Sequence, residues 1–527
     1  GWMWVDGSYP SYTAWRGGEP SNSGGAEDYA VYFVRSQNWN DISRDALQWG
    51  CVVEFDSEPL MLLEAEMLFS PITVSGDVPV SLLPRATDLA GNPLNQDGDT
   101  VNGEIDEDAM AETFSIIGSL DNAFYVCRVE PSDEAQAPYD RLRIVFSQPV
   151  LDGTLTLDDV ELLDVNAATV LTAVGLTRIS DYVYELDTTG SMTAGVYELR
   201  IGPDVQSDTA LWLDQDRDGT GGEPDDDVVK VLLVAQDMHI PQGDASYENW
   251  IILVNGVVLT ADGVHTFTSV RLLAGATLTH SACTATTEYG LDLRCSDVLD
   301  VDAESSIDVS QRGYLKGTTV GNTTVGGATG KSGGSHGGYG IDNTGNANEV
   351  YDAYDDPQHP GAGGGTSGSW SAGGGLIRVQ ASVLRLDGAL KADGNHATGW
   401  RNSAGAGGGI RVDVNVLWGF GTISANGGNG ASDRLPAGGG RIAVYCDDAS
   451  GFDFDAVQAL AGAGASVGTV YVRQAGGESS LRIDSHGGTV GHYTPIGIGS
   501  DTTVIDDRLV VAGAGVIAAP HHQFPLT

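Results

Sequence analysis

The sequence predicts a multidomain protein that is mainly β. A chain of 527 residues is too long for one ordinary hydrophobic core, so we expect several domains, each with its own apolar interior. With 73 glycines, 41% hydrophobic residues, many Val, Thr and Asp residues and few lysines, the composition favours strands and tight turns over helical bundles. Strand-sized alternating segments separated by Gly, Pro and Asp recur along the chain.

The formal net charge of −46 comes from 26 basic and 72 acidic residues. Such a chain repels phosphate groups, so the charge argues against nucleic acid and anionic membranes as partners and favours cations. An acidic surface also keeps secreted or salt-adapted proteins soluble, and this reading stays open for much of the charge. The sequence has no apolar run long enough to cross a bilayer, so we expect no membrane insertion within it.

The five cysteines are too few for a disulfide-built scaffold and show no CxxC spacing, so we expect no thiol chemistry. Whether Cys283 and Cys295 pair is left open. The chain begins on a dense motif at 1–7 without an initiator Met and carries no stop signal at 524–527. We therefore expect a piece of a longer polypeptide whose export and anchoring signals lie elsewhere.

Residues 1–56 alternate aromatic side chains with Gly, Pro and Asn, a composition suited to long ordered loops held by Trp anchors. Four elements follow in order: Gly18-Glu19-Pro20-Ser21-Asn22, Glu27-Asp28, Trp39-Asn40-Asp41 and Gly50-Cys51-Val52-Val53-Glu54-Phe55. In order and spacing they resemble the C-terminal half of a C-type lectin domain. We therefore expect a partial C-type lectin-like domain at 1–56.

This resemblance implies calcium-dependent carbohydrate binding. Calcium takes about six to eight oxygen ligands from carboxylates, amides and carbonyls. In the family, a Glu and an Asn around a proline, a second Glu and an Asn-Asp pair hold one ion and also bind vicinal sugar hydroxyls. The matching positions, for both the metal and the sugar, are Glu19, Ser21, Glu27, Asn40 and Asp41, with Asn22 at a place that can serve an auxiliary ion.

Three departures from the family pattern keep a second interpretation open. Ser21 stands where mannose-type members carry Asn, and Tyr29 and Arg44 stand where the family has its inner disulfide. The N-terminal half of the domain is absent from this sequence, which leaves Cys51 without its usual partner. The alternative is a lectin-like fold that no longer binds sugar.

Alternating segments at 142–146, 155–157 and 196–201 indicate short strands between 57 and 237, at a spacing typical of a β-sandwich. The segment Phe146–Val150, with Gly195–Tyr197, resembles the bacterial Ig-like modules that occur in tandem in surface proteins. We expect an incomplete Ig-like module at 57–116 and an Ig-like β-sandwich module at 117–237.

An acidic loop occurs twice in this region, 119 residues apart. Oxygen side chains at positions 1, 3, 5 and 12 match the spacing of an EF-hand-type calcium loop, without its flanking helices. Only the second copy has glycine, Gly219, at the sixth position; the first has Thr100. The predicted ligands are Asn95, Asp97, Asp99 and Asp106 in the first copy and Asp214, Asp216, Asp218 and Asp225 in the second. The alternative is a solvated acidic turn.

Residues 238–527 carry a Gly-rich motif that ends at Gly375, Gly409, Gly440 and Gly468, at intervals of 34, 31 and 28 residues. A period of this length is typical of a solenoid. Each copy also has a second strand that ends in a turn, as at 384–388. Stacked strands with alternating aliphatic residues and tight glycine corners predict a right-handed parallel β-helix, similar to the Gly-rich β-helical repeats of large secreted bacterial proteins.

Some β-helices are polysaccharide lyases or hydrolases, so we considered catalytic residues. The candidates are Asp352, Asp355, Asp356 and His359 in the non-repeating loop 351–360, with His336 close in sequence. The sequence shows neither the calcium cluster and base that a lyase needs nor the spaced carboxylate pair that a hydrolase needs. We therefore expect a solvent-exposed acidic loop and no enzyme. His521-His522 we read as a chance pair.

The leading hypothesis is an extracellular or cell-surface adhesin that binds glycans or cell-surface polysaccharide with Ca²⁺ as cofactor. Weak single sites would act through avidity on a bacterial-type surface. A first alternative is a structural subunit of an extracellular filament or surface layer, with copies of itself as partners through an exposed end rung or strand edge. A second alternative is a β-helical polysaccharide lyase or hydrolase.

Overall fold

The computed structural model of the chain is mainly β, with several sheets and two 3₁₀ turns, Leu157–Asp159 and Phe454–Ala456, among the described residues. It describes the strands at 29–33, 38–42, 76–82 and 110–116, residues 123–131, and residues 139–521 apart from 203, 216, 224–225, 366–370, 398–402, 431–434, 478 and 498–506. The chain divides into two compact units, 1–68 and 69–527. No described helix is long and apolar enough to cross a membrane.

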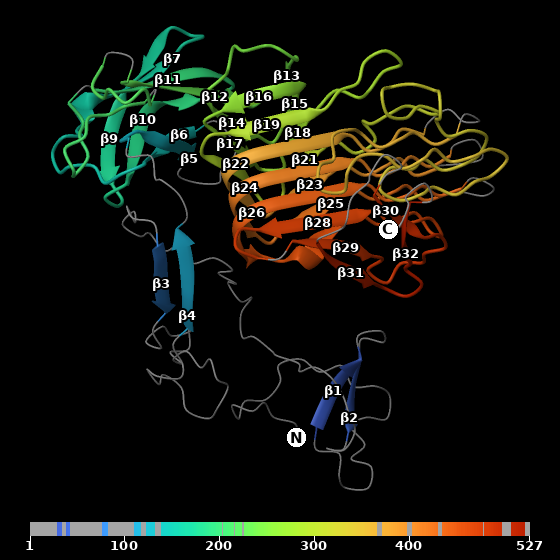
Figure 1. Cartoon of the computed structure of the whole chain (residues 1–527). Coiled ribbons are helices and arrows are strands. Elements are labelled where there is room, and N and C mark those ends of the chain that lie inside the picture. Colours follow the sequence, from blue (N-terminus) through green and yellow to red (C-terminus); the bar gives the residue numbers. More distant parts are fainter. Residues whose placement is uncertain are drawn as a thin grey trace. The chain divides into compact units, whose positions relative to one another are not determined.

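In the first unit, β1 (Tyr29–Phe33) and β2 (Asn38–Ile42) form an antiparallel pair in which Tyr29 lies opposite Ile42. Early in the second unit, β3 (Gly76–Leu82) and β4 (Met110–Ile116) form another antiparallel pair. Figure 1 shows both pairs. The four-part division that we expect from the sequence stays a prediction.

Residues 123–234 form two sheet layers around one core. The first layer has the order β5-β6-β10-β9 and the second runs β12-β11-β7-β8. Alternation sets their faces: in β6, Leu142, Ile144 and Phe146 are buried while the residues between them face outward. The strands are β5 (Val126–Pro131), β6 (Tyr139–Phe146), β7 (Val160–Asp164), β8 (Thr169–Leu171), β9 (Ala173–Arg178), β10 (Val183–Met192), β11 (Gly195–Ile201) and β12 (Val228–Val234).

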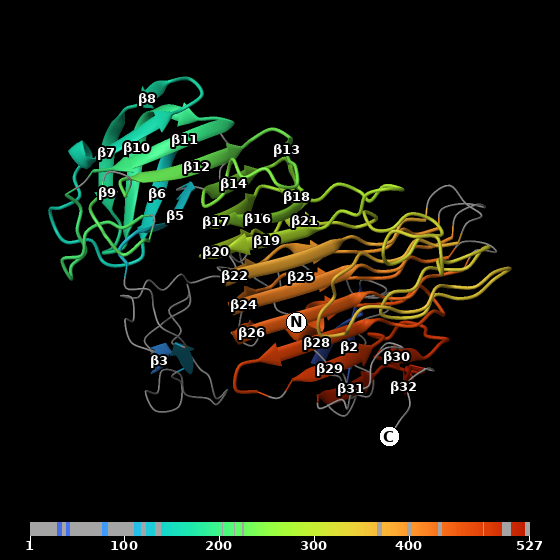
Figure 2. The ribbon, with the colours of Figure 1, turned by 45° about the horizontal axis from the view of Figure 1, so that its top comes forward.

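From Met238 the chain winds into a coil of parallel strands, alternating between a large and a small sheet (Figure 2). The large-sheet strands are β14 (Ile251–Asn255), β17 (Ser269–Leu273), β20 (Val298–Val301), β22 (Leu376–Leu386), β24 (Gly409–Gly419), β26 (Arg441–Phe452) and β28 (Thr469–Gln474). The small-sheet strands are β13 (Met238–Ile240), β15 (Val258–Ala261), β18 (Thr277–Thr279), β21 (Ser306–Asp308), β23 (Ala389–Lys391), β25 (Thr422–Ser424) and β27 (Val457–Gln458). An additional pair, β16 (Gly263–Phe267) and β19 (Leu291–Cys295), joins the large sheet at β22.

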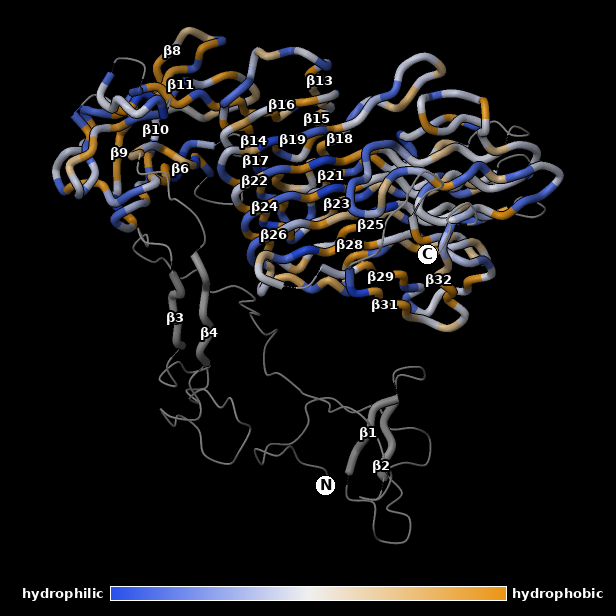
Figure 3. Tube along the Cα trace, in the orientation of Figure 1, coloured by the Kyte–Doolittle hydropathy of each residue, from blue (hydrophilic) through white to orange (hydrophobic). Residues whose placement is uncertain are grey.

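Aliphatic residues of both sheets fill the inside of the coil in stacked columns. One column consists of Leu384 and Leu417, and another consists of Ile377, Ile410 and Ile442. The residues of each column pair in register on neighbouring strands, and all are fully buried. In Figure 3 hydrophobic and hydrophilic positions alternate along these strands, as expected when one face is inside and the other in solvent.

The Gly-rich repeat is explained by the close approach of successive turns of the coil. A Cβ added to Gly408 would lie 2.0 Å from the carbonyl oxygen of Gly375, which is far too close. The same clash recurs one turn later between Gly440 and the carbonyl oxygen of Gly408, at 2.1 Å, and again between Gly468 and the carbonyl oxygen of Gly440, at 2.0 Å. The strand register corrects our alignment of the repeat: Leu376 pairs with Gly409, so Gly408 and not Gly409 is equivalent to Gly375. The structural intervals are therefore 33, 32 and 28 residues.

At its last turns the coil changes pattern. Strand β29 (Ser480–Asp484) pairs antiparallel with β28, and β31 (Arg508–Ala512) then pairs parallel with β29. Facing them, β30 (Thr494–Ile496) pairs with β32 (Ala518–Pro520). Leu481, Ile483, Val467 and Ile496 form a small core between these sheets.

The two-layer part and the coil share one large sheet, because β12 pairs parallel with β14. A buried ion network reinforces this junction. Arg271 Nη1 donates to Glu130 Oε2 at 2.5 Å and Arg271 Nε lies 3.1 Å from Asp300 Oδ2. Burial raises the pKa of the Asp300 carboxyl, and Arg271 and Arg385 oppose that shift.

Candidate functional site

Of the predicted lectin-like site, the structure describes the backbone of two residues. Asn40 and Asp41 lie on β2, opposite Val31 and Ala30 of β1. The other predicted positions, Glu19, Ser21, Asn22 and Glu27, lie outside the described residues.

The second acidic loop is partly described. It follows an isolated β-bridge at Leu213 and closes on itself: the amide of Gly219 donates to Asp214 Oδ2 at 3.1 Å, and Gly219 has a φ of 96°. The amide of Thr220 donates to Asp218 Oδ1 at 2.8 Å. Asp216 and Asp225, and the whole first loop with Asn95, Asp97, Asp99 and Asp106, lie outside the described residues.

Asp226 is a structural residue of this loop that the sequence reasoning missed. Its side chain is buried and accepts from the amides of Gln215 and Glu223, both at 2.9 Å. Gln215 in turn bonds both backbone groups of Val126, at 2.8 and 3.1 Å. The loop is therefore fixed to β5 through Gln215, which lies between two predicted ligands, and closed on itself by Asp226, which follows the last one. Three consecutive aspartates at 225–227 were the available signal, but sequence does not say which one turns inward.

The described part of the loop fits a calcium loop in two respects. Position six is a glycine in the left-handed region, as the sharp turn of such loops requires, and its amide bonds the carboxylate at position one. Asp214 and Asp218 would supply hard oxygen ligands, which calcium prefers. Asp226 would not, because its two oxygens hold the backbone. Among the described residues no group of three or more His, Cys, Asp or Glu side chains converges as a metal site.

A hollow of about 380 Å³ lies against the same loop. Its lining includes Trp212, which is 44% exposed, together with Phe124, Asp214 and Arg217. The guanidinium of Arg217 lies 4.5 Å from the centre of the Tyr125 ring. The size is in the range that small ligands occupy, but the two charged residues of the described lining are already engaged in holding the loop.

The loop 351–360 brings three of the considered catalytic residues together. Asp352 Oδ2 lies 3.1 Å from His336 Nε2, and Asp352 Oδ1 lies 2.6 Å from His359 Nδ1. The amides of Gln358 and His359 also donate to Asp352 Oδ2, at 3.0 and 2.9 Å. The carboxylate is thus surrounded by four donors and its side chain is only 5% exposed.

These contacts set the charge state of the group. Burial alone would raise the pKa of the Asp352 carboxyl, but the hydrogen bonds from His336 and His359 outweigh burial and hold that pKa well below its usual range. The hydrogen bond to Asp352 raises the pKa of His359, against the opposing effect of burial. An anion so enclosed is suited to anchor the loop rather than to contact a substrate.

The other acidic residues of the loop also anchor it to the coil. Asp356 Oδ1 accepts from Arg378 at 3.0 Å and from Arg411 at 2.8 Å, on neighbouring strands β22 and β24. The carbonyl oxygen of Asp355 accepts from the hydroxyl of Tyr445 on β26 at 2.9 Å. The acidic residues 352, 355 and 356 therefore bond the loop to three successive strands and to its own backbone, and do not form a spaced carboxylate pair.

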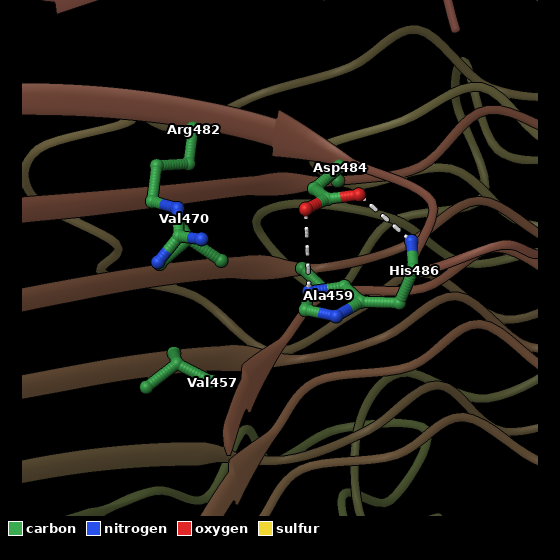
Figure 4. A pocket seen from close by; sticks show the side chains of 7 residues that line it. Val457, Ala459, Val470, Arg482, Asp484 and His486 are labelled. Atoms are coloured by element: carbon green, nitrogen blue, oxygen red, sulfur yellow. Dashed lines mark hydrogen bonds and ion pairs between the residues drawn. The ribbon is translucent and has the colours of Figure 1, made fainter. Parts of the chain in front are cut away.

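Two further histidines of the described residues each lie beside a carboxylate. Figure 4 shows His486 beside Asp484, bordering a hollow of about 10 Å³, which has room for roughly one water molecule. His521 Nε2 lies 3.3 Å from Glu349 Oε2, while His522 lies outside the described residues.

A short stretch of the chain is similar in sequence to a known lectin. Over 43 residues the chain is 49% identical to ladderlectin from Oncorhynchus mykiss, which is 8% of this chain and 23% of ladderlectin. The chain thus spans less than a quarter of that relative. No protein-family model matches the chain. The similarity is consistent with a lectin-like segment and, through it, suggests carbohydrate binding.

Proposed function

We propose that the chain belongs to an extracellular, calcium-dependent adhesin that binds glycans or cell-surface polysaccharide and has no enzymatic activity. The observation that carries this proposal is the 49% identity to a lectin over 43 residues. It agrees with the order of the four sequence elements at 1–56. Within the proposal, the two-layer part at 123–234 is an Ig-like module and the coil is a right-handed parallel β-helix that displays the binding segment.

Calcium has two roles in this proposal. At Glu19, Ser21, Glu27, Asn40 and Asp41 it bridges protein and sugar, because C-type lectins usually bind carbohydrate through this ion. In the second acidic loop it neutralises Asp214 and Asp218 and stiffens the junction between modules. The closure of that loop at Gly219 supports the second role.

The enzyme alternative finds less support in the loop 351–360. A hydrolase needs two carboxylates that reach a substrate. Asp352 is enclosed by four donors and Asp356 is held by two arginines, so both act as anchors. Release of unsaturated or reducing ends from acidic polysaccharide would be the result that favours this alternative.

The proposal is tested by retention of the chain on immobilised glycans with and without calcium. We expect retention in calcium, loss on chelation, and a decrease of about tenfold or more in Asp41→Ala, because a metal ligand is removed. Asp413→Ala is the control: it removes an acidic residue of β24 in the other unit. Retention that survives both chelation and Asp41→Ala would contradict the proposal.

A further inference from the structure

The last strand of the large sheet presents inward-facing aliphatic residues that are not covered. Leu509 and Val511 on β31 are in register with Leu481 and Ile483 on β29 and therefore lie on the same face. On the neighbouring strand β29, Leu481 and Ile483 are fully buried. On β31, in contrast, Leu509 is 43% exposed and Val511 is 44% exposed. Among the described residues, the aliphatic face of the coil thus continues to β31, where its side chains are exposed. Ile517, just before β32, is also strongly exposed.

The strand edges at this end are open as well. In the described part of the chain, β31 is the terminal strand of the large sheet, and β32 pairs with β30 alone. An unpaired edge offers a row of backbone donors and acceptors to another strand. Figure 1 shows β31 and β32 together at the red end of the coil, and Figure 3 shows hydrophobic positions along both.

The opposite end of the coil does not offer the same surface. There the large-sheet edge at β14 is already paired with β12 of the two-layer part. The far edge of the same sheet is β8, a strand of only three residues, and short edge strands resist pairing. Two other strands at that end, β16 and β13, each pair on one side only among the described residues, with β19 and β15. A head-to-tail contact would therefore join β31 to a different strand and continue from copy to copy, whereas two copies that meet through β31 use the same edge twice and close the assembly.

We propose that β31 is a self-association surface and that two copies of this chain pair antiparallel through β31 around a two-fold axis. This goes beyond glycan binding and does not depend on it. Pairing centred on Val510 sets Leu509 opposite Val511 of the partner and Arg508 opposite Ala512 of the partner. Aliphatic residues then face aliphatic residues, and the two arginines do not face each other. The coil already accepts antiparallel pairing at this end, between β28 and β29.

The first test is the molar mass of the full chain in solution, by light scattering during gel filtration over a range of concentrations. We expect a concentration-dependent dimer. The double variant Leu509→Asp/Val511→Asp sets carboxylates opposite each other in the interface and should leave only monomer. Because both positions are exposed in the single chain, the circular dichroism spectrum should not change.

Val170→Asp/Val174→Asp is the matched control. It introduces two aspartates at valines that are 51% and 53% exposed, on β8 and β9, which are the edge strands of the large sheet and of the four-stranded sheet. This variant should remain dimeric. A wild-type chain that is monomeric at every concentration, an open-ended polymer, or a dimer lost in the control and kept in Leu509→Asp/Val511→Asp would each overturn the proposal.

A second test fixes the register. In the proposed pairing Val510 meets its own copy, and directly opposed residues of antiparallel strands are close enough for a disulfide. Val510→Cys should therefore give a covalent dimer on mild oxidation, detected by non-reducing electrophoresis. Val174→Cys measures the background from exposed thiols and from the native cysteines. Equal cross-linking in the two variants contradicts pairing through β31.

Discussion

The buried carboxylate of Asp352 shows how a single residue holds a long loop. It accepts hydrogen bonds from two imidazoles and two backbone amides, and the loop 351–360 closes around it. Removal of a buried charged partner typically costs about 3 kcal/mol or more of unfolding free energy. We expect Asp352→Asn to destabilise the coil by about that amount in denaturant unfolding. Asp355→Asn, in the same loop, is the control and should cost well under about 1 kcal/mol.

The same residue predicts a pH dependence whose sign follows from the two pKa shifts. The pKa of Asp352 is lowered, so its contribution is complete above about pH 4 and is lost as the pH falls toward the folded value. The pKa of His359 is raised, so its contribution is complete below about pH 6.5 and is lost as the pH rises through the folded value. Both contributions are therefore complete between these limits.

The measurement is the difference in unfolding free energy between wild type and Asp352→Asn across pH. Taking this difference cancels the contributions of groups that titrate alike in both proteins. One such group is His280, whose pKa is lowered to about 4 by burial. The difference should be greatest between about pH 4 and pH 6.5 and should decrease on both sides. A difference that stays constant from acid to alkaline pH contradicts the assignment.

At the level of elements, the glycine repeat is a packing requirement. Gly440 lies between backbone atoms of the neighbouring turn, where a Cβ would meet Gly408 O at 2.1 Å. Since backbone cannot move aside cheaply, we expect Gly440→Ala to lower the unfolding free energy by about 3 kcal/mol or more. Gly477→Ala is the control, because the nearest atom there is 3.6 Å away. Equal melting temperatures for both variants would exclude this account of the repeat.

The junction of the two-layer part and the coil depends on Arg271, which lies between the buried carboxylates of Glu130 and Asp300. Arg271→Met leaves each buried carboxylate with one remaining arginine, Arg128 at 3.1 Å from Glu130 and Arg385 at 3.9 Å from Asp300. We expect it to cost about 3 kcal/mol of unfolding free energy, the lower end of the range for breaking a buried ion pair. Arg294→Met, which breaks the largely exposed pair with Asp292, should cost about 0–1 kcal/mol. Chemical unfolding of the two variants side by side distinguishes them.

Periodicity in the sequence predicts strands well and their partners poorly. The mainly β class follows from composition and is confirmed, and the Gly-rich period marks the turns of the coil. The alignment of Gly409 was wrong by one residue because three consecutive glycines are equivalent in sequence, and only the pairing of Leu376 with Gly409 separates them. The clustering of His336 with Asp352 and His359 depends on a long loop, whose path no periodicity encodes.

On the scale of the whole molecule, charge and self-association oppose each other. Each copy carries a formal charge of −46, so two copies repel at long range. The proposed contact through β31 is aliphatic and sets no like charges opposite each other, so salt should weaken the repulsion more than the contact itself. Under the proposed function, a dimer would also carry two copies of the glycan-binding segment, and two weak sites on one particle hold a surface more strongly than one through avidity.

Raising monovalent salt should therefore tighten the dimer, whereas an interface held by ion pairs would loosen. We expect the dissociation constant to fall by about tenfold from low to high ionic strength, as the Debye length shrinks from roughly 30 Å at 0.01 M to roughly 3 Å at 1 M. Sedimentation equilibrium in chelator-containing buffer measures this without a contribution from calcium. Leu509→Asp/Val511→Asp, with four more negative charges per dimer, should stay monomeric at low salt and recover dimer only partly at high salt, because screening does not replace the lost aliphatic contact.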